Sequence, residues 1–310
     1  MSSPLSVDVA HRALKHPDPR SFLKKATSTE ELTPRFGTAL QGIDLTQLSP
    51  DELDQLALFV AERGVVTLDN QQAFIDQTPE QLKAFGRHFS PRLHQHQVSG
   101  QPKGHPEFHL VYKSQKNEFN NYEKLDRYVP TVFHSDVSYE AQPPGFTLLF
   151  LFETPPSGGD TAFTDARELL RRLSPPLREF LSGLTAEHSG FEQYENAVKS
   201  GRGVAKRLPV AHSHPIVRTH PVTGEKTLYV NKGFTKKING LKLEESDALL
   251  KVLFDLNAEA IDAQLRVRWA PGKVVLWDNR ISQHSPIVDF TGNEGRRHGA
   301  RITPAAERPF

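Results

Sequence analysis

The 310-residue chain has no cysteine and no surplus of charge of either sign. Without cysteine it cannot carry a disulfide framework, a cysteine-ligated zinc ion or a thiol nucleophile. Its 38 basic and 37 acidic residues give a formal net charge of +1, which provides no electrostatic footprint for nucleic acid or an anionic membrane. The first residues lack an apolar signal segment, and no apolar run is long enough to span a bilayer. These absences favour a cytoplasmic enzyme or binding protein that needs neither nucleic acid nor a membrane.

Two helix starts stand out near the beginning of the chain. Ser49–Glu52 and Thr78–Gln81 each combine an N-cap hydroxyl, a proline in the first turn and the acidic or amide side chain of a capping box. They predict amphipathic helices that end near Arg63, before Gly64, and near Phe89. Later apolar runs are mostly strand-like and are separated by proline and glycine turns. These runs are Phe146–Phe152, Lys226–Asn231, Leu265–Trp269 and Val274–Trp277.

Many short strands with a few helices indicate a mainly β fold with flanking helices, whose core is a double-stranded β-helix, or jelly roll. Three later helices are predicted over Asp165–Leu173, Pro175–Leu181 and Glu244–Asn257. Residues 1–35 are polar and punctuated by proline, so we expect an N-terminal arm there, followed by a single domain over residues 36–310. Within that domain, residues 164–212 are expected to form an insertion over the mouth of the barrel.

The candidate metal ligands are His134, Asp136 and His284. On a strand, residues two apart point to the same face, so His134 and Asp136 could present an imidazole and a carboxylate together. A second imidazole from His284 would complete the set of two histidines and one carboxylate that holds ferrous iron and leaves positions open. By itself the His-x-Asp pair is equally consistent with a hydrogen-bonded pair on a surface strand.

Two other histidine pairs share the same spacing and could bind zinc on a strand. They are His94 with His96 and His212 with His214, and neither has a carboxylate in the same register. A site built from either pair would favour a zinc hydrolase instead of an iron enzyme.

Two arginines near the end of the chain, Arg297 and Arg301, would face the same side of a final strand. A guanidinium can hold a carboxylate by two hydrogen bonds, so two inward arginines near iron would anchor two different anions. On the surface they would simply be solvated charges. Gly158–Thr161 allows a tight turn that presents a hydroxyl donor.

Together these segments resemble the taurine dioxygenase-like (TauD/TfdA) family of Fe(II)- and 2-oxoglutarate-dependent oxygenases, and its fungal branch in particular. The resemblance extends from roughly Gly37 to Thr303. The segments that carry it follow the family's order: Gly42–Leu45, His134–Asp136, Gly158–Thr161, His220–Gly224, Asn231–Phe234, Trp277–Arg280 with His284, and Arg296–Arg297 with Arg301. Each segment is common by itself, whereas the ordered set is specific.

The resemblance implies a role for each candidate near the metal. His134, Asp136 and His284 would bind Fe(II), and Thr161 and Arg297 would hold the distal carboxylate of the cosubstrate 2-oxoglutarate. Three protein ligands leave room for the keto acid and for dioxygen. The implied reaction hydroxylates a C–H bond while 2-oxoglutarate is oxidatively decarboxylated to succinate and CO2.

The resemblance also implies how a small anionic substrate is held. Arg301 would bind its anionic end, His96 would lie in the substrate pocket, and Phe234 and Tyr139 would line that pocket with aromatic surface. The first expectation is a sulfonate or sulfate ester, because hydroxylation beside the heteroatom gives a product that splits into an aldehyde and sulfite or sulfate.

Two alternatives to this expectation stay open at this point. A biosynthetic oxygenase acting on an amino acid or other carboxylate would use the same iron site, and a catalytically silent barrel would only bind a small ligand. Taurine itself is disfavoured, because Arg127–Thr131 lacks the asparagine that taurine enzymes carry there and Gln97 replaces a usual proline. A homo-oligomer is compatible with all of these readings.

Overall fold

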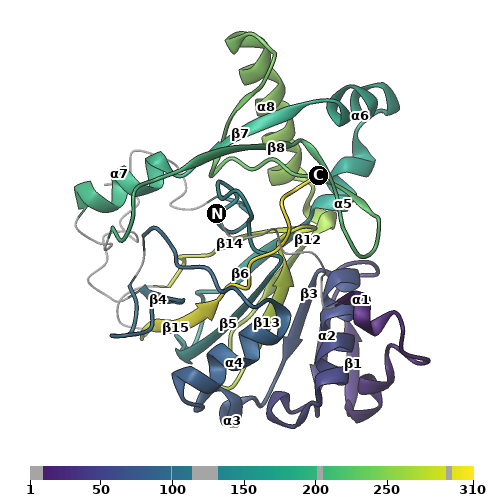
Figure 1. Ribbon diagram of the computed structural model, residues 1–310, viewed down its shortest axis with the longest axis vertical. Helices are drawn as coiled ribbons and strands as arrows, with labels where there is room; N and C mark the ends of the chain where they lie inside the picture. The colour runs from purple at the N-terminus through teal and green to yellow at the C-terminus, as the bar shows by residue number, and fades with distance from the viewer. Residues whose placement is uncertain (1–9, 99, 114–131, 201–204, 291–294) are drawn as a thin grey trace.

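The computed structural model describes residues 10–98, 100–113, 132–200, 205–290 and 295–310, and β-strands form the framework of this part of the chain (Figure 1). The largest sheet has seven strands in the order β1-β2-β3-β13-β5-β15-β4. Their bounds are β1 Ser28–Glu31, β2 Thr38–Gln41, β3 Val65–Leu68, β13 Val274–Asp278, β5 Phe146–Glu153, β15 Arg297–Ile302 and β4 Phe108–Lys113. In this sheet β2 and β3 are parallel, and the other neighbours are antiparallel.

A second sheet packs against the inner face of the first. It has three strands in the order β12-β6-β14. Their bounds are Gln264–Val267, Thr161–Asp165 and Ser282–Pro286. Side chains of the two sheets meet in the interior, where the ring centroids of Phe163 and Trp277 lie 5.4 Å apart. Strand alternation explains this contact: Val275 and Trp277 point inward, whereas Val274 and Leu276 join a core outside the barrel.

Four helices lie on the outer side of the large sheet, with α1 packed against α2 (Figure 1). They are α1 (Ala10–Ala13), α2 (Pro50–Arg63), α3 (Gln72–Ile75) and α4 (Pro79–Phe89). Both predicted capping boxes are present, at the first turns of α2 and α4. Gly64 ends α2 with a φ of 76°, a conformation that glycine adopts without strain. The mainly β architecture and these two helices therefore confirm the sequence predictions.

The strand predictions are confirmed by β5, β12 and β13, with one difference in length elsewhere. Lys226–Asn231 was expected to be a strand, but β10 covers only Lys226–Leu228. Asn231 does not continue the ladder, because its backbone N–H donates to the Thr235 hydroxyl at 2.9 Å. The chain turns there and enters β11 (Thr235–Ile238).

The described residues of the predicted insertion that follow β6 fold together with later segments into a lobe beside the barrel. The lobe contains helices α5 (Ala166–Arg172), α6 (Pro175–Ser182), α7 (Phe191–Ser200) and α8 (Leu243–Glu259), and strands β7 (Thr185–Ser189), β8 (Ala211–Pro215), β9 (Val217–Thr219), β10 and β11. Figure 1 shows β7 and β8 running past the barrel, with α6 and α8 on the far side of them. Leu169, Leu181, Ile216 and Leu253 belong to a separate core inside this lobe. Residues 201–204 of the predicted insertion lie outside the described residues.

The described part of the predicted N-terminal arm packs against the rest of the chain. Phe22, in the short 3-10 helix Ser21–Lys25, is fully buried. Arg12 forms an ion pair with Asp54 of α2, and β1 pairs with β2 along its whole length. Residues 1–9 lie outside the described residues, and the boundary between arm and domain stays a prediction.

A buried charge network at the end of β13 explains part of the Trp277–Arg280 motif. The Arg280 guanidinium donates to both carboxylate oxygens of Asp278, and His220 Nε2 lies 3.1 Å from Asp278 Oδ2. Burial alone would raise the pKa of Asp278, but Arg280 and His220 hold it well below its usual range. The carboxylate is therefore charged and compensated inside the protein.

We expect Asp278→Ala to lower the free energy of unfolding by about 3–5 kcal/mol, because it removes the nearest carboxylate partner of the buried Arg280 guanidinium, whose contact with Glu307 is longer, at 3.5 Å. Urea denaturation followed by circular dichroism measures the change. Asp255→Ala, which breaks an exposed ion pair with Lys251 on α8, is the control and should change little. Equal stability of the two variants would contradict a structural role for Asp278.

Candidate active site

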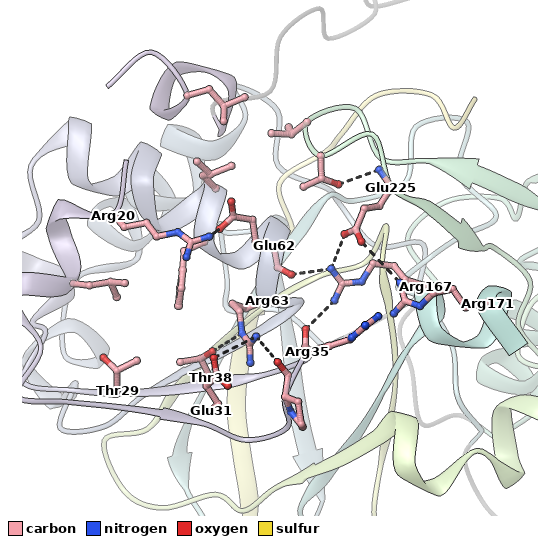
Figure 2. A pocket seen from close by; sticks show the side chains of 17 residues that line it. Arg20, Thr29, Glu31, Arg35, Thr38, Glu62, Arg63, Arg167, Arg171 and Glu225 are labelled. Carbon is pink, nitrogen blue, oxygen red and sulfur yellow. Dashed lines mark hydrogen bonds and ion pairs between the residues drawn. The ribbon is translucent and has the colours of Figure 1, made fainter. Parts of the chain in front are cut away.

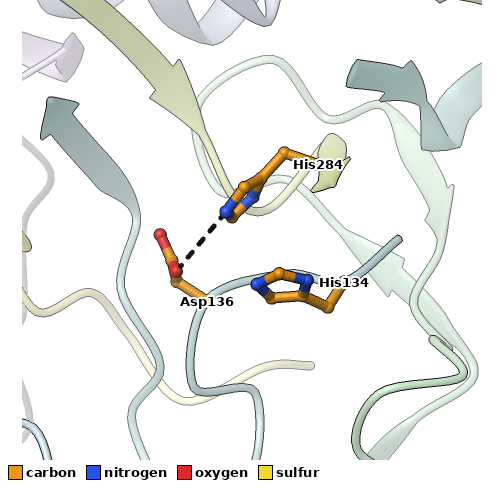
Figure 3. A group of neighbouring side chains, drawn as sticks. All are labelled: His134, Asp136 and His284. Carbon is orange, nitrogen blue, oxygen red and sulfur yellow. Dashed lines mark ion pairs between the residues drawn. The ribbon is translucent and has the colours of Figure 1, made fainter. Parts of the chain in front are cut away.

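Three side chains from two distant segments of the sequence lie close together (Figure 3). His134, Asp136 and His284 each offer one ligand atom, and these atoms all lie within 4.8 Å of one another. Within the described residues this is the one group of three or more metal-ligating side chains. The structure thus brings together the three residues that the sequence singled out.

His284 reaches the site from β14, and a short bridge places His134 beside it. The backbone N–H of each histidine donates to the carbonyl of the other, at 3.0 and 2.9 Å. The two rings lie with centroids 4.4 Å apart, and the His284 ring also packs on Trp277. Backbone pairing therefore fixes the distance between the two imidazoles.

The expectation that His134 and Asp136 share a continuous strand is wrong. His134 lies in an isolated bridge, and Asp136 begins a turn that continues through Tyr139. Val137 in this turn has a φ of 37°, which is strained for a β-branched residue. The carboxylate consequently reaches the imidazoles because the chain turns there, and strand alternation plays no part.

Two polar side chains orient Asp136, and the sequence analysis did not identify them. Thr147 on β5 donates its hydroxyl to Asp136 Oδ2 at 2.8 Å. Asn279 accepts the Asp136 backbone N–H at 3.0 Å and donates its amide to Thr147 Oγ1 at 2.9 Å. The available signal was the Trp277–Arg280 motif. Its asparagine is buried and stands in the sequence between Asp278 and Arg280, which form a buried ion pair.

Hydrogen bonding leaves the correct atoms available for a metal ion. Since a carbonyl can only accept, the 2.9 Å contact from His134 Nδ1 to the Val132 carbonyl puts the proton on Nδ1 and leaves Nε2 as a lone pair. His284 Nε2 lies 3.7 Å from Asp136 Oδ1, and Oδ1 is buried without a hydrogen-bond partner. A divalent cation would satisfy all three atoms, so the residues present fit a ferrous ion.

The protonation states suit the same assignment. Burial lowers the pKa of His134 and of His284, so both rings are neutral at physiological pH. Burial would raise the pKa of Asp136, but Arg301 and the two histidines together hold it well below its usual range. Two neutral imidazoles and one carboxylate form the donor set that binds ferrous iron and leaves coordination positions open.

Thr161 and Arg297 meet in the lining of the same cavity. Arg297 donates to the Gly159 carbonyl at 2.8 Å and to the Thr161 hydroxyl at 3.3 Å. Gly159 has a φ of 70°, and a Cβ there would come within 3.3 Å of the Arg297 side chain. Burial lowers the pKa of Arg297 to about 10, so its guanidinium is still charged at neutral pH. This corner therefore offers a buried cation and a hydroxyl to an anionic group.

Arg301 lies between the metal ligands and the cavity. Its Nη1 is 2.6 Å from Asp136 Oδ1, an ion-pair contact without the alignment of a hydrogen bond. Arg297 and Arg301 both point inward from β15, separated by Gly299. A Cβ on Gly299 would lie 2.2 Å from the Phe150 carbonyl, so glycine is required between the two arginines.

The cavity at this site has a volume of about 250 Å³. Charged and polar side chains that line it include His134, His284, Thr161, Arg297 and Arg301. Its described lining contains no acidic residue. The cavity is therefore polar at the metal end and suited to anions.

The three other predicted substrate residues lie behind this lining. His96 is buried and its Nε2 lies 2.8 Å from Thr303 Oγ1. Tyr139 is fully buried, with its hydroxyl donated to Gln193 of α7, and Phe234 packs edge-on against both Tyr139 and His134. Direct contact of these three residues with substrate stays a prediction, as does the comparison at Arg127–Thr131, which lies outside the described residues.

The competing histidine pairs do not form a metal site in the described structure. His94 lies 2.9 Å from the Gln142 carbonyl, His212 lies 2.7 Å from the Tyr139 carbonyl, and His214 lies 2.9 Å from the Glu140 carbonyl. Each of these imidazoles is thus held by a backbone acceptor. The geometry favours the iron-type site over a zinc hydrolase.

A larger cavity, of about 820 Å³, lies between α2, β2 and α5 (Figure 2). Two of its cations are already paired: Arg63 lies 3.8 Å from Glu31 and donates to Thr38 and to backbone carbonyls, and the buried Arg167 donates to Asp165 and Glu225. Since these charges are compensated within the protein, the smaller cavity at the metal ligands is the better candidate for catalysis.

Comparison with known proteins agrees with this geometry. The family model described as "Taurine catabolism dioxygenase TauD, TfdA family" matches residues 28–303. A Saccharomyces cerevisiae α-ketoglutarate-dependent sulfonate dioxygenase is 46% identical over 280 residues, covering 90% of this chain and 67% of the yeast protein. The Penicillium expansum α-ketoglutarate-dependent dioxygenase cnsM is 40% identical over 98% of this chain and 84% of its own length.

A solved structure shares the fold. A putative α-ketoglutarate-dependent taurine dioxygenase from Burkholderia xenovorans superposes with a TM-score of 0.73 at 29% identity, covering 91% of this chain and 93% of the bacterial chain. The predicted jelly-roll core is thereby confirmed. No helix in the described part of the chain is both long and apolar enough to serve as a membrane span.

The chain belongs to the TauD/TfdA family of dioxygenases. The predicted enzyme class, a non-haem Fe(II)- and 2-oxoglutarate-dependent dioxygenase, is confirmed, together with its iron and its cosubstrate.

Proposed function

We propose that this enzyme oxidises a small organic oxyanion, with a sulfonate or sulfate ester as the prime substrate, and that it does so at His134, Asp136 and His284. The observation that carries the proposal is the convergence of these ligands beside a cavity whose two inward cations are Arg297 and Arg301. The yeast and Pseudomonas putida relatives are named for sulfonate and sulfate ester substrates, which supports the same class.

Different side chains bind the cosubstrate and the prime substrate. Bound Fe(II), with 2-oxoglutarate and dioxygen, supplies the oxidation of a C–H bond and the decarboxylation of the keto acid to succinate. Thr161 and Arg297 bind the distal carboxylate of 2-oxoglutarate. The charge-assisted hydrogen bond from Arg297 fixes the orientation of the cosubstrate. Arg301 holds the anionic end of the substrate, so that the carbon beside the heteroatom lies nearest the oxidant. The protein therefore selects the position of attack by geometry.

The test is a substrate panel scored by succinate and by sulfite or sulfate release. Alkanesulfonates and alkyl sulfates should give both products, with Fe(II) and 2-oxoglutarate required. Amino acids and simple carboxylates form the second arm, because relatives such as cnsM make a biosynthetic role the alternative. Succinate released with carboxylates and no sulfite from any sulfonate would replace the first substrate class with the second.

Arg301→Ala should raise KM for the prime substrate about tenfold or more, because it removes a charge-assisted contact worth about 1.5–3 kcal/mol. The KM for 2-oxoglutarate should change much less. Steady-state kinetics with each substrate varied in turn makes the comparison. If only the 2-oxoglutarate KM rose, the roles of Arg297 and Arg301 would be reversed.

A cytoplasmic location and a homo-oligomeric state are part of the same proposal. They remain predictions from composition and resemblance, and fractionation and light scattering test them.

A further inference from the structure

His109, which the sequence motifs do not include, faces the interior of the barrel directly opposite Arg301. The two residues are register partners on the antiparallel strands β4 and β15. Alternation along β4 puts Phe108 and Leu110 against the outer core, whereas Val111 packs against the inner one. His109 therefore points inward, and it lines the same cavity as Arg301 and the iron ligands.

Both members of this pair have unused hydrogen-bonding atoms. Nδ1 of His109 and Nε of Arg301 are buried without a hydrogen-bond partner. A buried polar atom left unpaired is unfavourable by about 1–3 kcal/mol, so one such atom on each of two register partners indicates that a ligand completes the site. Directly opposed residues on antiparallel strands have Cβ atoms about 4.5–5.5 Å apart, close enough to bind one small group.

His96 and Thr303 hold the His109 ring in place. Thr303 Oγ1 lies 2.8 Å from His96 Nε2, and the His96 ring packs edge-on against the His109 ring with centroids 4.7 Å apart. The histidine that the family resemblance assigned to the substrate pocket thus contacts His109 in this chain. We assign His96 a positioning role toward His109.

The charge around His109 defines the group that it would bind. Burial, and then the charges of Arg301 and Lys206, lower the pKa of His109 well below its usual range, so the ring is neutral and carries one N–H donor. Arg301 supplies the positive charge. A carboxylate held by both of its oxygens on Arg301 could accept the His109 N–H only at an oxygen that Arg301 already holds, whereas a sulfonate or sulfate presents a third oxygen to it.

We propose that His109 and Arg301 together bind the tetrahedral oxyanion of the prime substrate, with the His109 N–H donating to an oxygen that Arg301 does not hold. This inference rests on the proposed function. It makes His109 the residue that determines the preference for a sulfonate or sulfate head group over a carboxylate.

The test measures binding directly, without turnover. Anaerobic titration calorimetry on enzyme loaded with Fe(II) and 2-oxoglutarate compares 1-butanesulfonate with pentanoate, which share a four-carbon chain. The wild type should bind the sulfonate more tightly. His109→Leu should weaken sulfonate binding about tenfold or more and pentanoate binding much less, since it removes a hydrogen bond to a charged group.

Two further variants control the result. His109→Gln keeps an N–H donor and should retain part of the sulfonate preference, which also protects the test if the leucine variant folds poorly. His105→Leu removes a histidine outside the barrel, beside Glu80, and should bind both probes as the wild type does.

Wild-type sulfonate affinity in His109→Leu, or no sulfonate preference in the wild type, would overturn the inference. The proposed function fails separately, if the substrate panel gives no succinate, or neither sulfite nor sulfate. The binding measurement tests the role of His109 and the turnover measurement tests the proposed function, so either hypothesis can fail while the other holds.

Discussion

His134→Ala should abolish Fe(II) binding and succinate formation while leaving the fold intact. The substitution removes one of three protein ligands, and even partners of metal ligands change metal affinity or activity by about 10–100-fold. We therefore expect a loss larger than about 100-fold. Iron content after anaerobic loading and succinate release with the best substrate of the panel provide the two measurements.

The stability of His134→Ala should stay near that of the wild type, because His134 lies at the cavity and the substitution removes only ring contacts with Phe234 and His284 and one hydrogen bond to the Val132 carbonyl. His212→Ala is the matched control. It removes a histidine that is bonded to the Tyr139 carbonyl and belongs to no metal group in the described structure. Full activity in His134→Ala, or equal iron loss in both variants, would refute the ligand assignment.

Asp136→Ala should also abolish Fe(II) binding and succinate formation. This variant tests whether Asp136 binds the metal ion or only pairs with Arg301. Asp136 contacts Arg301, so its loss frees the guanidinium while removing a metal ligand. Iron binding should fall as far as in His134→Ala. Retained iron binding would mean that the carboxylate serves only to pair with Arg301.

Arg297→Ala should weaken 2-oxoglutarate binding by about 10–150-fold, the equivalent of a charge-assisted contact worth about 1.5–3 kcal/mol. The guanidinium is buried, charged and fixed by Gly159 and Thr161, so few rearrangements can compensate for its loss. The KM for 2-oxoglutarate, measured at saturating prime substrate, reports the effect, and the iron content should not change.

The neighbouring arginine supplies the control. Arg296 has half of its side chain exposed and pairs with Glu153 outside the barrel, so Arg296→Ala should leave the KM for 2-oxoglutarate unchanged. An unchanged KM in Arg297→Ala, or a similar rise in both variants, would reject the cosubstrate role of Arg297.

Local sequence signals predicted much of the fold. Capping boxes at Ser49 and Thr78 fixed two helix starts, because caps depend on residues only three apart. Continuous apolar runs between proline and glycine turns predicted β5 and β13. By contrast β4, which carries His109, was missed, because its run Phe108–Lys113 mixes histidine, tyrosine and lysine with apolar residues and has no clear alternation.

The candidate site was predicted from residue types and the order of motifs, and the geometry then differed in instructive ways. His134 and Asp136 were assigned to one strand, whereas a turn with Val137 at positive φ brings them together. The His96 ring lies against His109, and no pattern along the chain could have indicated that contact.

The sequence by itself determined the chemistry: the absence of thiols, the two histidines and one carboxylate, and the two arginines near the end. Only the tertiary structure decided which atoms face the metal, how Thr147 and Asn279 orient Asp136, and that His109 lies opposite Arg301. The physical reason is that ligand geometry depends on pairing between strands that are far apart along the chain. Such pairing leaves no local periodicity in the sequence.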